Sequence, residues 1–213
     1  MAQYFEERPR AASDQDTVEL TVGERTLALA TDSGVFSRHR LDPGTAVLLR
    51  KAPAPPPAGV ALDLGCGYGP IACALAVQSP DALVWAIDVN ERARELTARN
   101  AGEHALTNVT VAAPDDVPAA VRFDTIYSNP PIRIGKEAMH ALLDRWLPRL
   151  VPGHGRAYLV VQKHLGADSL QRRLEDTGFA TDRLASSKGY RVLEVRPRRS
   201  ATEAARRSAT EAE

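Results

Sequence analysis

The chain is poor in cysteine and in aromatic residues, and it has no long apolar run. Its 213 residues include 2 Cys, and Phe, Trp and Tyr together make up 5%. Two cysteines do not make a disulfide framework or a zinc site, so we expect Cys66 and Cys73 to be buried thiols and expect no metal. No segment approaches the roughly 18 apolar residues of a membrane span. The opening MAQYFEERPR lacks the apolar core of a signal peptide. These absences favour a cytoplasmic protein without a membrane anchor.

The net charge of the chain is zero, but the charge is unevenly distributed along it. Residues 1–131 carry 11 Lys and Arg against 17 Asp and Glu, a net charge of −6. Residues 132–199 carry 14 against 7, a net charge of +7, and residues 200–213 carry 2 against 3. A basic second half is compatible with a phosphate-bearing partner, and equally with a solvated surface that binds nothing.

Apolar residues recur with the periods of strands and helices. Alternation predicts a β-hairpin over 17–31, followed by a loop over 32–45 and a stiff Pro- and Ala-rich linker over 52–59. Beyond the linker, strand and helix patterns alternate, which predicts a mostly parallel sheet with helices on both faces. Asn90 is the predicted N-cap of one helix. The predicted strands are 60–64, 82–88, 109–113, 123–128, 155–162, 180–187 and 190–197, and the predicted helices are 70–78, 91–101, 136–150 and 169–178.

These patterns divide the chain into three parts. Residues 1–57 form an N-terminal extension with the hairpin and the Pro-rich linker, and residues 58–197 form the main domain. Residues 198–213 contain RRSATEA twice, without large apolar residues. Such a segment cannot bury enough surface to order itself, so we expect a disordered tail.

Ligands of open α/β sheets bind beyond the carboxyl ends of the strands, and three polar features fall there. LDLGCGYGP (62–70) has three glycines that permit a tight turn and a close approach of backbone to ligand. Its G-x-G-x-G spacing differs from that of dinucleotide sites. Asp88 ends the second main-domain strand, where it can accept hydrogen bonds from both hydroxyls of a ribose or cap a helix. Asp115-Asp116 follows the third, where an acceptor could meet an adenine amine or simply lie in a turn.

The fourth feature is SNPPIRIG (128–135), in which two prolines end a predicted strand. Proline lacks a backbone donor and has a fixed φ, so the pair cannot continue a central strand. An Asn-Pro-Pro segment alone is typical of a turn. Here Asn129 follows a strand whose end is expected beside the glycine turn and Asp88.

DLGCGYG, Asp88 and SNPPIR together resemble class I S-adenosylmethionine-dependent methyltransferases that methylate nitrogen. SNPPIRIGKEAMHALL, VVQKHLGADSL and KGYRVL are similar, more narrowly, to the small-subunit (16S) rRNA guanine-N2 methyltransferase C family and its single-domain relatives. TDSGVFS and LDPGT resemble the segment that leads into the family's catalytic domain, and the similarity runs from about Tyr4 to Arg196. The resemblance implies a Rossmann-like sheet of seven strands with a short N-terminal β extension.

The resemblance also implies that S-adenosylmethionine is the cofactor. Asp63 and the turn from Gly65 to Gly69 would hold its methionine part, Asp88 its ribose and Asp115 its adenine. Residues upstream would wall the pocket from the N-terminal side. The full set of predicted cofactor-binding residues is Phe36, Asp42, Gly44, Asp63, Gly65, Cys66, Gly67, Gly69, Asp88, Val89 and Asp115.

For the substrate, the resemblance implies a guanine amine in rRNA or in the small ribosomal subunit. The Asn129 side-chain oxygen and the Pro130 carbonyl would each accept one N–H of that amine, and Pro131 would add rigidity. A base inside a helix must be flipped out to reach such a pocket, where Phe36 or Tyr190 would stack on it. The other predicted substrate contacts are Ile132 and five cations that would meet RNA phosphate: Arg133, Lys136, Lys163, Lys188 and Arg191.

Two alternative functions remain open at this point. The same Asn-Pro-Pro geometry would serve another planar amine, in DNA, in a protein glutamine or in a small molecule. A non-catalytic RNA-binding factor for ribosome assembly could also keep the fold, although intact Asp63, Asp88 and Asn129 argue against it. Longer family members carry a second, degenerate domain, and only about 57 residues precede the predicted core here. RNA recognition by that domain would have to come from elsewhere.

Overall fold

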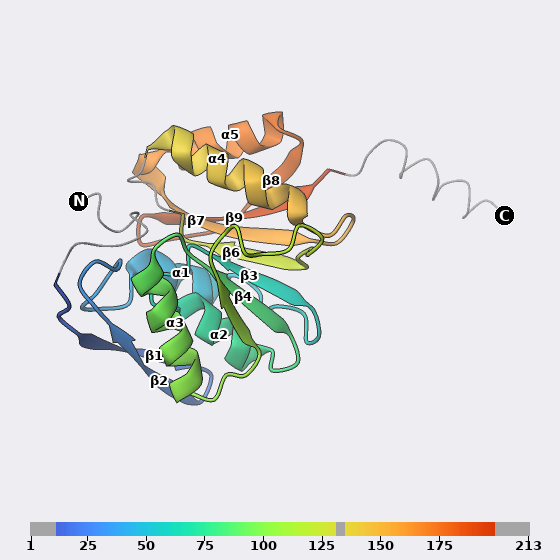
Figure 1. The fold of residues 1–213 in the computed structure, drawn as a ribbon. Coiled ribbons are helices and arrows are strands. Elements are labelled where there is room, and N and C mark those ends of the chain that lie inside the picture. The colour runs from blue at the N-terminus through green and yellow to red at the C-terminus, as the bar shows by residue number, and fades with distance from the viewer. Residues whose placement is uncertain (1–11, 131–134, 199–213) are drawn as a thin grey trace.

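The computed structural model describes residues 12–130 and 135–198, and a seven-stranded sheet forms its centre (Figure 1). The strand order is β5-β4-β3-β6-β7-β9-β8, and β9 is antiparallel to both of its neighbours. The predicted mostly parallel sheet is therefore confirmed. The strands are β3 (Val60–Leu64), β4 (Leu83–Ile87), β5 (Val109–Ala112), β6 (Thr125–Ser128), β7 (Arg156–Gln162), β8 (Phe179–Ser187) and β9 (Tyr190–Pro197).

The strand order reverses direction at β3. The chain runs from β3 outward through β4 to β5 and then returns to the other side of β3 as β6. In open α/β sheets, such a reversal leaves a crevice beyond the carboxyl ends of the two central strands. In this chain the glycine turn follows β3 and Asn129 follows β6, so both lie at that crevice.

Helices cover both faces of the sheet, and each face has its own apolar core (Figure 1). Trp146 is fully buried in one core, with its ring centroid 6.1 Å from that of Phe123. Successive residues of the strands alternate between the two cores, as the pleat requires. On one face lie α1 (Pro43–Lys51), α2 (Pro70–Gln78) and α3 (Glu91–Glu103); on the other lie α4 (Lys136–Trp146), α5 (Ala167–Asp176) and the 3-10 turn η3 (Leu147–Arg149). A second 3-10 turn, η4 (Lys163–Leu165), follows β7.

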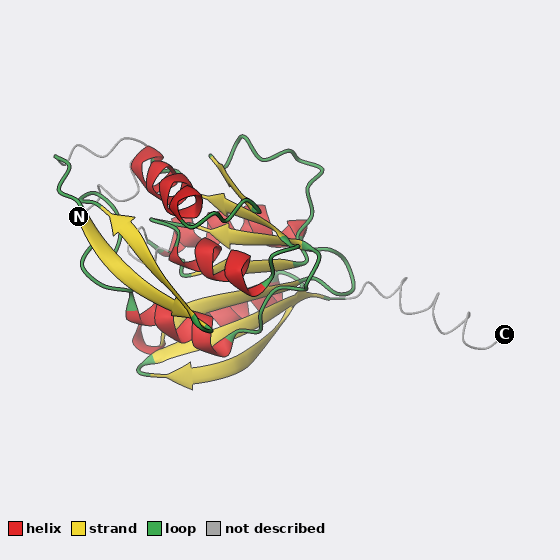
Figure 2. Cartoon of the chain, turned by 90° about the horizontal axis from the view of Figure 1, so that it is seen from below, coloured by secondary structure: helices red, strands yellow, loops and turns green. Residues whose placement is uncertain are grey.

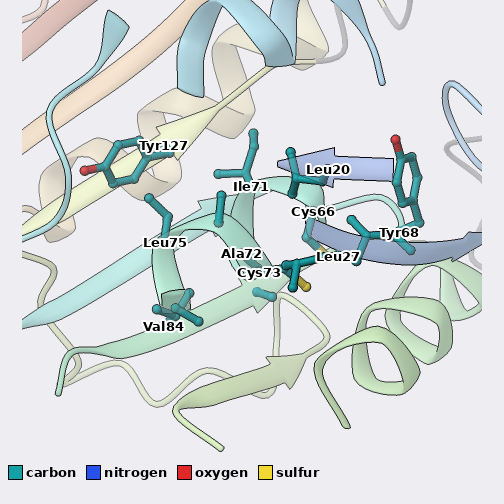
Figure 3. Packing of buried hydrophobic residues seen from close by; sticks show 14 of the residues in the cluster. Leu20, Leu27, Cys66, Tyr68, Ile71, Ala72, Cys73, Leu75, Val84 and Tyr127 are labelled. Carbon is teal, nitrogen blue, oxygen red and sulfur yellow. The ribbon is translucent and has the colours of Figure 1, made fainter. Parts of the chain in front are cut away.

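The N-terminal hairpin, β1 (Asp16–Val22) and β2 (Arg25–Thr31), forms a separate two-stranded sheet outside α2 and α3 (Figures 1 and 2). Every second residue of β1 is buried, which is the alternation expected of a strand with one covered face. In Figure 3, Leu20 and Leu27 of the hairpin lie beside Tyr68 and Cys66 of the glycine turn. The hairpin therefore shares a core with the main domain and backs the turn that forms the crevice.

Most predicted elements are confirmed with small changes at their ends, and one is wrong. The predicted loop 32–45 overlaps helix α1, which begins at Pro43. Asp42 caps this helix by accepting the Thr45 N–H, Pro43 stands at a first-turn position where proline fits, and Val47 and Leu48 are buried. The predicted helix 136–150 continues as a 3-10 turn after Trp146, because Pro148 cannot take part in α-helical hydrogen bonding.

Cys66 and Cys73 are buried free thiols, as predicted. Burial raises the pKa of Cys73 to about 12, so this thiol is not reactive near neutral pH. Among residues 12–130 and 135–198, no group of His, Cys, Asp or Glu is arranged to hold a metal ion, and no helix is long and apolar enough to cross a bilayer. The repeat of the predicted tail lies outside the described residues, except for Arg198.

Candidate functional site

A cavity of about 860 Å³ lies at the crevice, and ten of the predicted site residues that the structure describes line it. Its walls come from the loop before α1, the glycine turn, the end of β4, the end of β6, helix α4 and the facing ends of β7 and β9. It is therefore built from segments far apart in the sequence. The ten predicted residues that line it are Phe36, Asp42, Gly65, Cys66, Gly67, Asp88, Val89, Asn129, Pro130 and Tyr190.

The three predicted glycines of the turn have two different roles. Gly65 and Gly67 line the cavity with φ of 79° and 58°, and a Cβ built on either would meet no atom within 4 Å. Gly69 also has a positive φ, but it does not line the cavity, and a Cβ there would lie 2.9 Å from Thr97 Cγ2. The first two glycines leave bare backbone at the cavity, and the third lets α2 approach α3.

Asp88 joins the end of β4 to the glycine turn. Its Oδ2 accepts the Gly67 N–H at 3.0 Å and its Oδ1 accepts the Asn90 N–H at 2.9 Å. Each carboxylate oxygen can accept about two hydrogen bonds, so each keeps an acceptor site beyond these backbone contacts. Burial raises the pKa of Asp88, and the backbone donors with Arg94 offset part of that effect. Asn90 caps α3 by accepting the Ala93 N–H at 3.2 Å, as predicted.

Asp63 lies beneath the turn and faces away from the cavity. Its side chain is fully buried, and its Oδ2 accepts the Ala72 N–H at 2.9 Å in the first turn of α2. Because the N-cap of α2 is Gly69, which has no side chain, Asp63 supplies the capping acceptor from the neighbouring strand. Within the described chain its Oδ1 has no hydrogen-bond partner. Burial raises the pKa of Asp63 to about 8, and the nearby charge of Asp88 adds to the shift.

Asn129 is held by the N-terminus of α1. Its Nδ2 donates to Asp42 Oδ1 at 2.7 Å and lies 3.1 Å from Thr45 Oγ1. The same Asp42 oxygen accepts the Thr45 N–H at 2.9 Å. Gly44 makes room for this arrangement, since a Cβ there would lie 2.9 Å from both Asp42 Oδ1 and Tyr190 Cε1. Gly44 therefore shapes the cavity wall from behind and does not line it.

The remaining predicted residues that the structure describes do not line the cavity. Asp115 is exposed and its Oδ1 binds Arg145 Nη2 at 2.7 Å. Arg191 is buried and pairs with Asp168, which is the environment of a structural ion pair. Lys136, Lys163 and Lys188 are exposed. Pro131, Ile132 and Arg133 lie outside the described residues.

Several cavity residues were not predicted from the sequence. Gln162, at the end of β7, donates through Nε2 to the Tyr190 hydroxyl at 3.0 Å across the β7–β9 pair. Arg145 comes from the face of α4 that covers the cavity. Their signal in the sequence is weak, because each reaches the cavity only through the pairing or packing of distant elements. The unpredicted lining residues also include Arg40, Pro43, Pro114, Leu142 and Leu165.

The strand order, the glycine turn after β3 and the acidic end of β4 define a class I S-adenosylmethionine-dependent methyltransferase, and S-adenosylmethionine is its cofactor. The model of the methyltransferase small domain family matches residues 26–194, and the chain belongs to this family.

Two curated relatives and one solved structure illustrate the similarity. The chain is 35% identical to the uncharacterized protein YbxB of Bacillus subtilis (strain 168), over 91% of this chain and 97% of YbxB. It is 33% identical to ribosomal RNA small subunit methyltransferase C of Pseudomonas aeruginosa (strain LESB58), over 83% of this chain and 53% of that protein. The T. Thermophilus 16S rRNA N2 G1207 methyltransferase (RsmC), solved with AdoMet and guanosine, superposes with a TM-score of 0.68 at 23% identity. The superposition covers 89% of this chain and 52% of that one, so this chain spans about half of each rRNA enzyme.

Proposed function

We propose that the protein transfers a methyl group to the N2 amine of a guanine in 16S rRNA. The observation that carries the proposal is the fixed side chain of Asn129, whose amide nitrogen is bound by Asp42 at 2.7 Å on the wall of the cavity. The oxygen of that amide is left to accept an N–H from a substrate amine. Similarity to several rRNA small subunit methyltransferase C proteins supports guanine in 16S rRNA as the target.

The residues around the crevice fit the cofactor. The bare backbone at Gly65 and Gly67 would admit its methionine part, where no Cβ intrudes. The acceptor sites left on Asp88 suit the two hydroxyls of its ribose. The adenine would lie on the side of the cavity that Pro114 lines, next to the exposed Asp115. Asp63 would support this site indirectly, through its hydrogen bond to the first turn of α2.

When bound, the cofactor would supply a methyl group on a positively charged sulfur. The electron pair of the acceptor nitrogen would form the new N–C bond as the C–S bond breaks, the neutral thioether would leave, and the methylated nitrogen would lose one proton to solvent. A guanine amine is a weak nucleophile because its lone pair is delocalised into the ring. Asn129 and the carbonyl of Pro130 would each accept one N–H, which holds the amine toward the methyl and favours a pyramidal nitrogen. Such catalysis rests on positioning and electrostatics, and a displacement of about 1 Å can cost about a hundredfold in rate.

The rest of the cavity suits a nucleobase that has been flipped out of its helix. Phe36 and Tyr190 line it and offer aromatic faces for stacking, while Gln162 adds a polar group at the same end. The exposed Lys136, Lys163 and Lys188 are proposed phosphate contacts. Arg191 is a weaker choice than these lysines, because its guanidinium is already paired with Asp168. An rRNA substrate also implies a cytoplasmic place of action.

The decisive experiment is transfer of a tritiated methyl group from S-adenosylmethionine to small ribosomal subunits from a strain that lacks the gene. The modified base is then mapped and the nucleoside identified by mass spectrometry. We expect label in 16S rRNA as N2-methylguanosine. Label in DNA, in a protein glutamine or in a small molecule, with none in rRNA, would refute the proposal and favour methylation of another planar amine.

A catalytic variant separates this proposal from a non-catalytic role in ribosome assembly. Asn129→Ala should retain cofactor affinity within about twofold, since Asn129 faces the amine, and should lose about a hundredfold or more in kcat. Calorimetry with S-adenosylmethionine and a melting curve serve as controls for folding. If the wild-type protein neither binds the cofactor nor labels any substrate, the assembly-factor function becomes the better explanation.

A further inference from the structure

We propose that Asp42 is a positioning residue that determines which end of the Asn129 amide faces the cavity. This inference rests on the proposed function for its catalytic consequence, but its structural basis is independent. A side-chain amide has a donor end and an acceptor end of nearly the same shape, so its orientation must be set by its neighbours. Only the orientation with the oxygen toward the cavity can hold an amine through its N–H groups.

The two hydrogen-bond partners of Asn129, Thr45 and Asp42, differ in how strongly they favour one orientation of its amide. A Thr hydroxyl both donates and accepts, so Thr45 Oγ1 at 3.1 Å tolerates either end of the amide. An aspartate carboxylate only accepts, so Asp42 Oδ1 at 2.7 Å requires the NH₂ end. Rotating the amide would place two acceptor oxygens against each other. A lost hydrogen bond to a charged group corresponds to a population ratio of about 10- to 100-fold, which is enough to fix one orientation.

Asp42 is itself held in place by its role as the N-cap of α1. One oxygen, Oδ1, accepts both the Thr45 N–H at 2.9 Å and the Asn129 amide. Gly44 keeps the space for that oxygen clear, because a Cβ at this position would lie 2.9 Å from it. The N-cap of α1 therefore fixes the orientation of the Asn129 amide at the end of β6, although Asp42 and Asn129 are 87 positions apart in the sequence.

The selected orientation leaves an acceptor for the substrate. Among residues 12–130 and 135–198, no group donates a hydrogen bond to Asn129 Oδ1, and Asn129 lines the cavity. A substrate nitrogen that carries hydrogens can bind this oxygen, and a ring nitrogen or carbonyl that only accepts cannot. Asp42 would thus make the site selective for amines through its hydrogen bond to Asn129.

Two substitutions of Asp42 separate this role from helix capping. Asp42→Ser keeps a good N-cap for α1, but its oxygen is one bond closer to the backbone and does not reach Asn129. Asp42→Asn keeps an oxygen for both contacts, since the Thr45 N–H requires an acceptor. The amide nitrogen that it introduces takes the place of Oδ2, which accepts no hydrogen bond within the described residues. Both variants should fold, which a melting curve verifies.

With 16S rRNA as acceptor, we expect Asp42→Ser to lower kcat by about 10- to 100-fold while KM for the RNA changes less than about threefold. Asp42→Asn should restore kcat to within about fivefold of the wild type. Equal losses of kcat in the two variants would overturn the proposal, because the charge of residue 42, and not the orientation of the Asn129 amide, would then determine the rate. Wild-type kcat in Asp42→Ser would overturn it as well.

A second readout needs no substrate. In protein labelled with ¹⁵N at asparagine, the side-chain NH₂ pair of Asn129 is assigned by its loss in Asn129→Ala. In Asp42→Ser these proton shifts should move toward those of a free amide, and in Asp42→Asn they should stay near the wild-type values. Unchanged shifts in Asp42→Ser refute the positioning role even if rRNA is methylated. Changed shifts together with no methyl transfer by the wild type refute the proposed function and leave the positioning role standing.

Discussion

Asn100 and Ala30 exchange two hydrogen bonds: Asn100 Oδ1 accepts the Ala30 N–H at 2.8 Å, and Asn100 Nδ2 donates to the Ala30 carbonyl at 3.0 Å. The side chain of α3 thereby satisfies the edge of β2 as a neighbouring strand would. Asn100 Nδ2 also donates its second hydrogen to the carbonyl oxygen of Tyr68 in the glycine turn, with a nitrogen-to-oxygen distance of 2.8 Å. One buried amide thus fastens the N-terminal hairpin to the turn beside the cavity.

We expect Asn100→Ala to lower the free energy of unfolding by about 2–4 kcal/mol, because it leaves three backbone groups without partners in a buried setting. Helix propensity cannot account for a loss, since alanine is the better helix former. Glu103→Ala, on the same helix, removes only the exposed pair with Arg99 and should cost less than about 0.5 kcal/mol. Urea unfolding followed by circular dichroism measures both, and equal effects would contradict the assigned role of Asn100.

Gly67 and Gly69 offer a matched pair of substitutions in one turn. Both have positive φ, so alanine at either costs about 1–2 kcal/mol in backbone strain. Gly69→Ala also places a Cβ 2.9 Å from Thr97 Cγ2, which adds about 1–3 kcal/mol of overpacking. Gly67→Ala meets open space on the cavity wall, so it should weaken binding of S-adenosylmethionine more than it lowers stability.

The test combines unfolding with calorimetric titration of the cofactor. Thr97→Ser removes Cγ2 and keeps the hydroxyl, so it should recover part of the stability lost in Gly69→Ala and nothing in Gly67→Ala. A coupling above about 0.5 kcal/mol between positions 69 and 97 supports direct contact. The absence of coupling, or a loss of cofactor affinity that is larger in Gly69→Ala than in Gly67→Ala, would show that the two glycines have been assigned the wrong roles.

Asp88→Asn should weaken cofactor binding by about 10- to 100-fold. The substitution keeps the shape but places an NH₂ where a carboxylate oxygen accepts either the Gly67 or the Asn90 N–H, so one buried backbone donor loses its partner. Asp81→Asn is the matched control, because Asp81 is exposed and lies before the same strand at the opposite edge of the sheet. Titration calorimetry measures the affinity of both variants for S-adenosylmethionine. Comparable affinities in the two variants would show that Asp88 does not bind the cofactor.

The sequence predicted what depends on local pattern. Apolar runs and turn residues located the strands of the sheet, and the expectation that ligands bind at strand ends located Asp88 and Asn129. Helix α1 was missed because Pro43-Gly44 is typical of a turn, although Asp42 followed by proline is also a valid helix start. Gln162 and Arg145 could not be found, because strand pairing and the packing of α4 bring them to the cavity.

Asp63 shows where the interpretation of a correct motif was incomplete. Strand residues alternate between faces, and Leu64 lines the cavity while Asp63 points to α2. The glycine at the start of α2 leaves that helix without a side-chain cap of its own, which Asp63 provides. A motif locates such a residue in the chain, and only the direction of its side chain separates a ligand contact from a support beneath it.

Burial of Asp63 predicts a stability that falls as pH rises. The pKa of this carboxyl is about 8 in the folded protein, against about 3.9 in an unfolded chain. Between these values the folded state binds a proton that the unfolded state releases, so the free energy of unfolding decreases from about pH 4 to about pH 8. The slope from this group approaches about 1.4 kcal/mol per pH unit.

Asp63→Asn removes this titration and keeps the shape of the side chain. We expect the variant and the wild type to have similar stability at about pH 4 and below, and the variant to become progressively more stable than the wild type as pH rises toward 8. Asp88 also has a raised pKa and contributes a slope of the same sign, but it is present in both proteins and largely cancels from the difference. Urea unfolding of the cofactor-free proteins at several pH values measures that difference. A constant difference, or one that favours the wild type more strongly at high pH, would mean that Asp63 is ionised in the folded protein across this range.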